Sequence, residues 1–174
     1  MKRFLALLFL CILLFVSGCN NGTALDLPVK YYYPNATIAY GTEDGFISYE
    51  FREAKNKSTL ESINDYLKGP TNSGHENPFP ENTTAKQFEL QNDIVYLILS
   101  DSYATLTGLD ISIANACLSM TVLELTGASA VSIQCDTMQL DGQDSIIMDR
   151  NATMLYDSNK NTTPTETPPL ETAK

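Results

Sequence analysis

A chain of 174 residues and 19.2 kDa has the length of one ordinary domain, and 43% hydrophobic with 18% charged residues suffice for a buried core. Lys and Arg number 11 against 21 for Asp and Glu, and the net charge of -10 argues against electrostatic binding of nucleic acid or anionic lipid headgroups. The lack of Trp and the single His exclude a tryptophan sugar platform and a His-rich metal site, and we expect no cofactor.

The N-terminus has the pattern of an export signal. Lys2 and Arg3 precede an apolar run of 13 residues, Phe4–Val16. This run is shorter than the about 20 residues that a membrane-spanning helix needs, and it has the length of a signal-peptide core. The following Ser17-Gly18-Cys19 resembles the bacterial lipoprotein signal, in which small residues lead directly into a cysteine. The competing interpretations are an uncleaved anchor and an ordinary secretory signal.

This resemblance implies that residues 1–18 are removed and that Cys19 becomes the lipidation site at the start of the mature chain. Residues 19–27 then form a polar tether, and its eight residues after the cysteine reach at most about 28 Å. Because two or more acyl chains, palmitate among them, hold a protein stably in a membrane, we expect a lipid anchor on the extracytoplasmic face of the cell membrane. Without Lys2 and Arg3 the chain has 9 basic and 21 acidic residues, a net charge of -12.

The first elements of the mature chain are predicted to be strands. Val29–Tyr33 is rich in aromatic and β-branched residues and stops at a proline. A second extended segment runs from Ile38–Tyr40 into Phe46–Phe51, around the turn Gly41–Gly45. The three consecutive tyrosines of the first strand could form an exposed recognition stripe. Since side chains alternate along a strand, however, either Tyr32 or its two neighbours must face the core.

A short helix follows. Ser58-Thr59-Leu60-Glu61 has the form of a capping box, which predicts a helix start. Leu60, Ile63 and Leu67 recur at helical spacing and give one apolar stripe. The sequence Gly69-Pro70 predicts the helix end, because Gly adopts the left-handed conformation and Pro cannot continue a helix.

A hairpin and a longer helix come next. Thr83–Leu90 and Ile94–Leu99 are predicted strands joined by a turn at residues 91–93, and the second strand is apolar enough to be central. The helix is expected over Asp110–Leu125, ended by Gly127. Its apolar stripe consists of Ile111, Ala114, Leu118, Val122 and Leu125, widened by Ile113, Cys117 and Met120.

The C-terminal part supplies the last strands and a tail. Val131–Asp136 alternates strictly, which predicts that Val131, Ile133 and Cys135 face the core. A turn at Asp141-Gly142 then precedes a segment Ile146–Met148. The folded domain is therefore predicted over residues 28–156, with a disordered Thr/Pro-rich tail over 157–174. Two helices and a mixed or antiparallel sheet indicate an α+β fold, a two-layer sandwich.

Two cysteines remain in the predicted domain. Cys11 leaves with the signal and Cys19 is the predicted lipid site, which leaves Cys117 and Cys135. An extracytoplasmic compartment permits a disulfide between them. The alternative is that both are buried free thiols, which behave as small hydrophobic residues.

The sequence offers few catalytic candidates, and we expect a protein that is not an enzyme. His75 would have to pair with a cysteine or a serine, but it lies in a polar loop without a triad context. A carboxylate pair could come from Asp136, Asp141, Asp144 and Asp149, although acids around a turn are expected for solvation. Ser100-Asp101-Ser102 is interpreted as a strand end whose short side chains bond the backbone.

The order of landmarks resembles the GerMN domain, the sporulation and spore germination domain of membrane-anchored bacterial lipoproteins. The landmarks span about residues 60–143: Leu67-Lys68-Gly69-Pro70, Pro80-Glu81-Asn82-Thr83, Leu99-Ser100-Asp101-Ser102-Tyr103, Val122-Leu123-Glu124-Leu125, Val131–Cys135 and Asp141-Gly142-Gln143. The resemblance implies a fold similar to the ring-building motif and a non-enzymatic scaffold role. The chain departs from the pattern of the family's namesake, with one domain copy instead of two, an added tail and Asn-rich connectors.

The expected function is therefore a lipid-anchored envelope module that meets other envelope or sporulation-complex proteins during sporulation, germination or envelope assembly. A lipoprotein that binds a small ligand or a cell-wall fragment is the alternative. An assembly module needs an uncovered strand edge or apolar patch. A ligand binder needs a concave, mostly apolar pocket of about 300 Å3 or more.

Overall fold

In the computed structural model, residues 28–37 and 45–151 are described. The predicted signal 1–18, Cys19 and the tether 19–27 lie outside the described residues. So do the predicted extended segment 38–40 with most of the turn after it, the last residues 152–156 of the predicted domain and the tail 157–174. The elements are β1 (Pro28–Pro34), β2 (Ile47–Glu53), α2 (Thr59–Leu67), β3 (Ala85–Gln91), β4 (Ile94–Leu99), a 3-10 helix (Asp101–Thr105), α3 (Gly108–Thr126), β5 (Ala130–Cys135) and β6 (Ile146–Asp149).

The strands form two separate sheets. β1 and β2 pair antiparallel as a two-stranded ribbon, and the other strands form a sheet in the order β3-β4-β5-β6. In this sheet β4 and β5 are parallel and the two outer pairs are antiparallel. A parallel pair needs a long crossover, which the 3-10 helix and α3 supply between β4 and β5. The predicted α+β class with a mixed sheet is confirmed.

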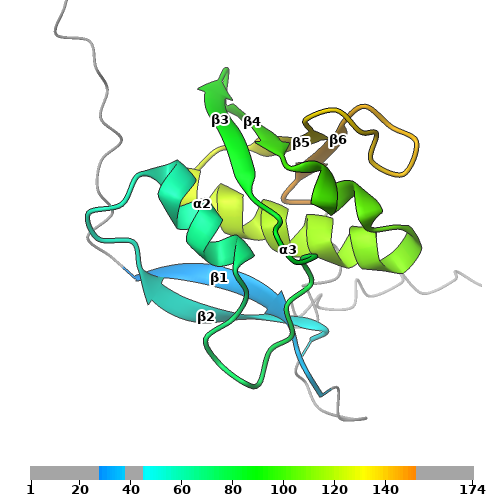
Figure 1. Cartoon of the computed structure of the whole chain (residues 1–174). Coiled ribbons are helices and arrows are strands. Elements are labelled where there is room, and N and C mark those ends of the chain that lie inside the picture. The colour runs from blue at the N-terminus through cyan, green and yellow to red at the C-terminus, as the bar shows by residue number, and fades with distance from the viewer. Residues whose placement is uncertain (1–27, 38–44, 152–174) are drawn as a thin grey trace, which may run out of the picture.

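Figure 1 shows the helices between the two sheets, with the four-stranded sheet above them and the ribbon below. α3 contacts β1 on one side and β5 and β6 on the other, and α2 lies beside it against β3. The helices cover one face of the larger sheet as expected. The ribbon adds a layer on their far side that the hydrophobic pattern did not reveal.

This third layer explains why α3 is buried on nearly all sides. The sequence predicts one apolar stripe, but polar residues between the stripe positions, Asn115, Ser119 and Thr121, are also buried. A helix with both faces covered needs small or hydrogen-bonded residues on its second face. Within the described ranges, α3 is also the one helix long and apolar enough to cross a membrane, and here it is the core helix of the domain.

The predicted helix ends and turns are confirmed. Ser58 accepts a hydrogen bond from the Glu61 backbone while the Glu61 side chain accepts one from the Ser58 backbone, so the capping box of α2 is complete. Gly69 and Gly127 follow α2 and α3 with φ of 106° and 72°, a conformation that favours glycine. The β3–β4 hairpin turns at Asn92 and Asp93, both with positive φ.

The core is a single cluster that includes side chains of both sheets and both helices. On β5, Val131 and Ile133 face it as predicted, whereas Cys135 is half-buried at the strand end. The Asp141-Gly142 turn closes a small bridge between Leu140 and Gln143, and Leu140 is fully buried. After this turn comes β6, a strand of only four residues that pairs antiparallel with β5 at the edge of the sheet.

Candidate functional site

The richest polar arrangement joins the ribbon to the helices. The edge of β1 opposite β2 faces the helices, and backbone groups on this edge form hydrogen bonds with helix side chains. The Tyr32 amide donates to the Thr121 Oγ1 of α3 at 3.0 Å, and the Tyr66 hydroxyl of α2 donates to the Tyr32 carbonyl at 2.7 Å. An unpaired edge strand would leave such groups unsatisfied, so two side chains of the helices complete the ribbon.

The three tyrosines of β1 are buried rather than displayed. Tyr31, Tyr32 and Tyr33 are at most 5% exposed. Tyr31 and Tyr33 both pack against the Tyr66 ring, with centroids 5.6 and 4.9 Å away, and Tyr32 meets Tyr49 edge-on from the other face of the ribbon. The exposed recognition stripe considered from the sequence is therefore absent at these positions.

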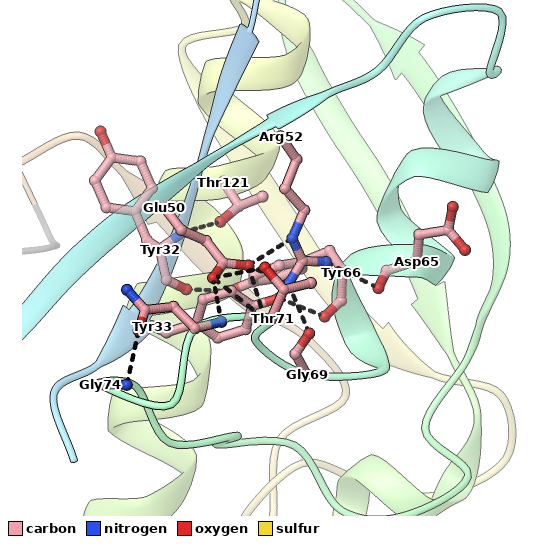
Figure 2. A network of polar contacts seen from close by, with 11 residues as sticks. Tyr32, Tyr33, Glu50, Arg52, Asp65, Tyr66, Gly69, Thr71, Gly74 and Thr121 are labelled. Carbon is pink, nitrogen blue, oxygen red and sulfur yellow. Dashed lines mark hydrogen bonds and ion pairs between the residues drawn. The ribbon is translucent and has the colours of Figure 1, made fainter.

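On the side of the ribbon that faces α2 lies a set of polar contacts centred on two residues of β2, Glu50 and Arg52 (Figure 2). The two side chains form an ion pair and are largely buried. The Glu50 carboxylate also accepts hydrogen bonds from the backbone amides of Thr71 and Asn72, at 3.1 and 2.9 Å, and from the Thr71 hydroxyl. We call these residues, together with those bonded to Arg52, the Glu50–Arg52 network.

Arg52 closes the C-terminal end of α2. Its guanidinium donates to the carbonyls of Asp65 and Gly69 and to the Tyr33 hydroxyl, and that hydroxyl donates to the Tyr66 carbonyl at 2.8 Å. The last carbonyls of a helix lack partners within the helix, and a cation also suits the negative end of its dipole. Arg52 thus ties strand, helix end and the following loop together (Figure 2).

The protonation states of this network are those of a structural element. Burial alone would raise the pKa of Glu50, but the hydrogen bonds from Thr71, Arg52 and Asn72 outweigh it and hold that pKa below its usual range. Burial raises the pKa of Tyr33 and Tyr66 well above that of a free tyrosine. The carboxylate is therefore charged and the hydroxyls neutral at pH 7, whereas a general acid or base is most efficient with a pKa near the working pH.

His75 lies beside the network and has a serine partner that the sequence did not suggest. The Nδ1 of His75 is 3.3 Å from the Ser48 Oγ, and the His75 ring stacks on Tyr33. The Ser48 hydroxyl, however, donates to the Asn35 Oδ1. A serine nucleophile must donate its proton to the histidine, so this arrangement lacks the hydrogen bond that a triad requires.

The four acids around the last turn do not converge. Asp136 forms an ion pair with Lys86, Asp144 accepts a hydrogen bond from Gln139, and the Asp149 carboxylate caps the Asn151 amide. Asp141 occupies the turn itself with φ of 49°. Among the described residues, no three His, Cys, Asp or Glu side chains are grouped to hold a metal ion.

Ser100-Asp101-Ser102 ends β4 in the way the sequence suggests. The Asp101 carboxylate accepts hydrogen bonds from the amides of Thr137 and Met138 and from the Thr137 hydroxyl, which lower its pKa. The Ser100 hydroxyl contacts that of Ser102 at 2.8 Å. These groups connect the end of β4 to the segment after β5.

Cys117 and Cys135 are free thiols in the structure, which has no disulfide between them. Cys117 is buried in the middle of α3, and burial raises its pKa far above the ordinary value. Burial also raises the pKa of Cys135 to about 11, and the nearby Asp101 charge acts in the same direction. Neither thiol is activated as a nucleophile, because only the thiolate is reactive.

A shallow hollow of about 340 Å3 lies between the end of β1, the connector before β3 and the start of α3. Its lining is mixed, and its apolar part includes Pro34, Phe46, Phe79, Leu106 and Ile113. Glu76 and Asp110 add carboxylates to it. The hollow has the minimum size of a small-ligand pocket, but it is open to solvent over much of its extent.

Comparisons with known proteins agree with this architecture. Residues 30–141, more than half of the chain, match the family described as Germane, sporulation and spore germination. The chain belongs to the Germane family. Its domain is of the GerMN type, and the matched region contains β2 to β5, both helices and all of β1 except its first two residues. No curated protein matches the chain.

Solved GerMN domains have the same fold. The first GerMN domain of the sporulation protein GerM from Bacillus subtilis is 13% identical with a TM-score of 0.51, over 71% of this chain and 95% of that domain. The tandem GerMN domains of GerM give 14% identity and a TM-score of 0.51, with 45% of the tandem chain covered. A candidate lipoprotein from Clostridium perfringens is 18% identical with a TM-score of 0.44, over 77% of this chain and 95% of that one.

Two of the sequence landmarks that resemble the GerMN domain have structural roles in this fold. Gly69-Pro70 follows the helix whose end Arg52 caps, and the Ser100–Ser102 segment connects β4 to the residues after β5. Sequence reasoning missed the Glu50–Arg52 network itself. The available signal was that Glu50 and Arg52 alternate with Tyr49 and Phe51, which places the two opposite charges on one face of a strand.

Proposed function

We propose that this protein is a lipid-anchored, non-enzymatic interaction module of the cell envelope, acting in sporulation, germination or envelope assembly. The observation that carries the proposal is that a GerMN-type domain begins directly behind a lipoprotein-type cysteine. β1 starts at Pro28, nine residues after Cys19. Family membership supports the process, and the cysteine supports the attachment.

The polar residues support a binding role over catalysis. Hydrogen bonds within the protein occupy the polar groups of the Glu50–Arg52 network, the Asp101 carboxylate and the Ser48 hydroxyl. A catalytic site needs convergent groups that are free to meet a substrate. In an interaction module the same groups hold the surface elements in fixed positions.

The short tether fixes where the module works. Eight residues after Cys19 reach at most about 28 Å, so the domain stays close to the membrane. The acidic mature chain is repelled by anionic headgroups and stands off from them. Lipid anchoring also raises the local concentration of the module relative to other anchored proteins, which strengthens weak contacts.

Crosslinking in intact cells followed by affinity purification tests the proposal. We expect the unsubstituted chain to fractionate with membranes and to recover spore-formation or wall-synthesis proteins. The Cys19→Ala variant should lose both properties, whereas Cys135→Ala, which changes a cysteine within the domain, should keep both. Recovery of the same proteins with Cys19→Ala, or an unsubstituted chain found in the soluble fraction, contradicts the proposal.

The hollow near Phe79 favours one alternative, a module that binds a cell-wall fragment. In that case titration calorimetry with purified cell-wall peptides should give saturable binding to the full chain. A Leu106→Trp variant, which fills the hollow, should abolish the binding. No heat of binding to any fragment leaves the interaction module as the better account.

A further inference from the structure

Within residues 28–37 and 45–151, the edge of β2 that points away from β1 has no strand beside it. Among the described elements β2 packs extensively only against β1, whereas the opposite edge of β1 is covered by the helices. A strand of seven residues with a free edge presents a row of backbone donors and acceptors that another strand can pair with.

The hydrogen-bond pattern identifies the residues whose backbone groups point outward. Tyr32 faces Tyr49 across the ribbon, and its amide leaves the ribbon toward Thr121, so this is a non-hydrogen-bonded pair. The bond from the Asn35 amide to the Phe46 carbonyl gives the same alternation. The amides and carbonyls of Ile47, Tyr49, Phe51 and Glu53 therefore point away from β1.

The same stretch exposes aromatic side chains. Tyr49 is 37% and Phe51 59% exposed, and their rings meet edge-to-face with centroids 5.2 Å apart. Glu50 and Arg52 alternate with them and are fixed on the other face by the network (Figure 2). The strand thus has an aromatic face, a charged face and a fixed orientation.

We infer that β2 pairs with β2 of a second copy of this chain, antiparallel and with the two-fold axis at Phe51. In this register Phe51 lies opposite Phe51 of the second copy, and Tyr49 lies opposite Glu53. Tyr49, Phe51 and Glu53 then each meet an outward-pointing residue of the other copy, which gives about six backbone hydrogen bonds between the copies. The inference rests on the proposed function and names a partner for the interaction module.

Charge favours an axis at Phe51 over one at Glu50. With the axis at Phe51, Glu50 of each copy lies opposite Arg52 of the other, and cross-strand pairs of opposite charge are favourable. An axis at Glu50 would place two glutamates opposite each other, which is unfavourable. The axis at Phe51 also brings together the most exposed aromatic rings of the two ribbons.

The start of the domain fits this geometry. Pro28 is opposite Glu53 in the ribbon, so both chains enter the domain beside the proposed axis. An axis through the two ribbons and normal to the membrane would let both copies be anchored in one leaflet. Two short tethers that begin near each other do not oppose such a dimer.

Sedimentation of the full chain, purified from membranes in density-matched detergent, tests the pairing. We expect a reversible dimer. Phe51→Lys places two like charges at the axis and removes both rings, and should raise the dimer dissociation constant by at least about tenfold. The control Tyr96→Lys changes an aromatic residue of the other sheet that is also exposed, to 38%, and should leave the dimer unchanged.

A second variant tests the register without relying on affinity. Hydrogen-bonded antiparallel partners have Cα atoms about 5.5 Å apart, within the range of a disulfide. Phe51→Cys should therefore form a crosslinked dimer under mild oxidation much faster than Tyr96→Cys, with the unsubstituted chain reporting any crosslink from native cysteines. Circular dichroism confirms that each variant is folded.

An unsubstituted chain that sediments as a monomer, a dimer unaffected by Phe51→Lys, or equal crosslinking of the two cysteine variants overturns the inference. These results leave the proposed function intact, since contacts with other envelope proteins are measured by the cell crosslinking described above. Loss of those contacts with a dimer still present would instead contradict the proposed function alone.

Discussion

The two sheets flank the same two helices but are held to them by different forces. The four-stranded sheet presents aliphatic side chains such as Val95, Leu97 and Ile133, which are fully buried. The ribbon is joined through tyrosine rings and a few directed hydrogen bonds, those of Tyr32, Tyr66 and Arg52 among them. Apolar contacts are numerous and tolerate substitution, whereas each hydrogen bond needs one particular donor and one acceptor. The stability of the ribbon's attachment should therefore depend on individual polar atoms, and that of the larger sheet on the volume that its buried side chains fill.

The largest effect is expected in the core of the larger sheet. Leu97→Ala removes a fully buried side chain and should lower the free energy of unfolding by about 3–5 kcal/mol, because a cavity remains. Urea unfolding followed by circular dichroism measures this. The adjacent Tyr96 faces outward, and Tyr96→Ala should cost about 1 kcal/mol or less. Equal losses would show that this face of β4 is not the packed one.

The next largest effect is expected from removing the charge of the Glu50 carboxylate. Glu50→Gln should lower the free energy of unfolding by about 2–3 kcal/mol at pH 7, because it removes a buried charge that pairs with Arg52 and two backbone amides. Glu53→Gln, at an exposed position of the same strand, should change it by less than about 0.5 kcal/mol.

The pH dependence has a defined sign. The pKa of Glu50 is lower in the folded state than in the unfolded chain, so its contribution is fully present above the unfolded pKa and is lost as pH falls through the folded pKa. The difference in unfolding free energy between the unsubstituted chain and Glu50→Gln should therefore shrink as the pH falls below the usual carboxyl range. A difference that is constant with pH contradicts a charge-based role.

A smaller effect should follow from the hydroxyl that covers the edge of β1. Thr121→Val keeps the shape of the side chain but leaves the Tyr32 amide without its partner on α3, at a cost of about 1–3 kcal/mol. Thr121→Ser retains the hydroxyl and should cost less. Hydrogen exchange of the Tyr32 amide should accelerate in the Val variant, and unchanged exchange would mean that this bond does not hold the ribbon.

The smallest expected difference in stability is between alanine variants of the two glycines that follow the helices. Gly127→Ala introduces a Cβ into open space at positive φ and should cost about 1 kcal/mol. Gly69→Ala has the same kind of strain, and its Cβ would also lie 2.9 Å from the Asn77 side-chain amide nitrogen. The Gly69 variant should therefore be less stable than the Gly127 variant by a few tenths to about 1 kcal/mol in thermal unfolding. Equal stability would show that Asn77 moves freely.

Local signals predicted much of the fold. The capping box at Ser58, the glycines after both helices and the turn at Asn92-Asp93 each depend on neighbouring residues, so a single sequence reveals them. The alternation of β5 predicted the inward residues Val131 and Ile133 for the same reason.

Long-range features could not be read in this way. The ribbon packs against α3 through residues 89 positions apart, Tyr32 and Thr121, and no periodicity encodes that contact. The bonds from Glu50 to Thr71 and Asn72 likewise join a strand to a distant loop. A buried threonine in a helix and opposite charges on one face of a strand are weak signals before the partner is known.

Attachment at the membrane is tested most directly by mass spectrometry of the N-terminal peptide of the native protein. The expected peptide begins at Cys19 and carries the mass of a diacylglyceryl group on its sulfur, with residues 1–18 absent. A peptide that retains residues 1–18 with an unmodified Cys19, from a protein recovered in the soluble fraction, would contradict the lipid-anchored module.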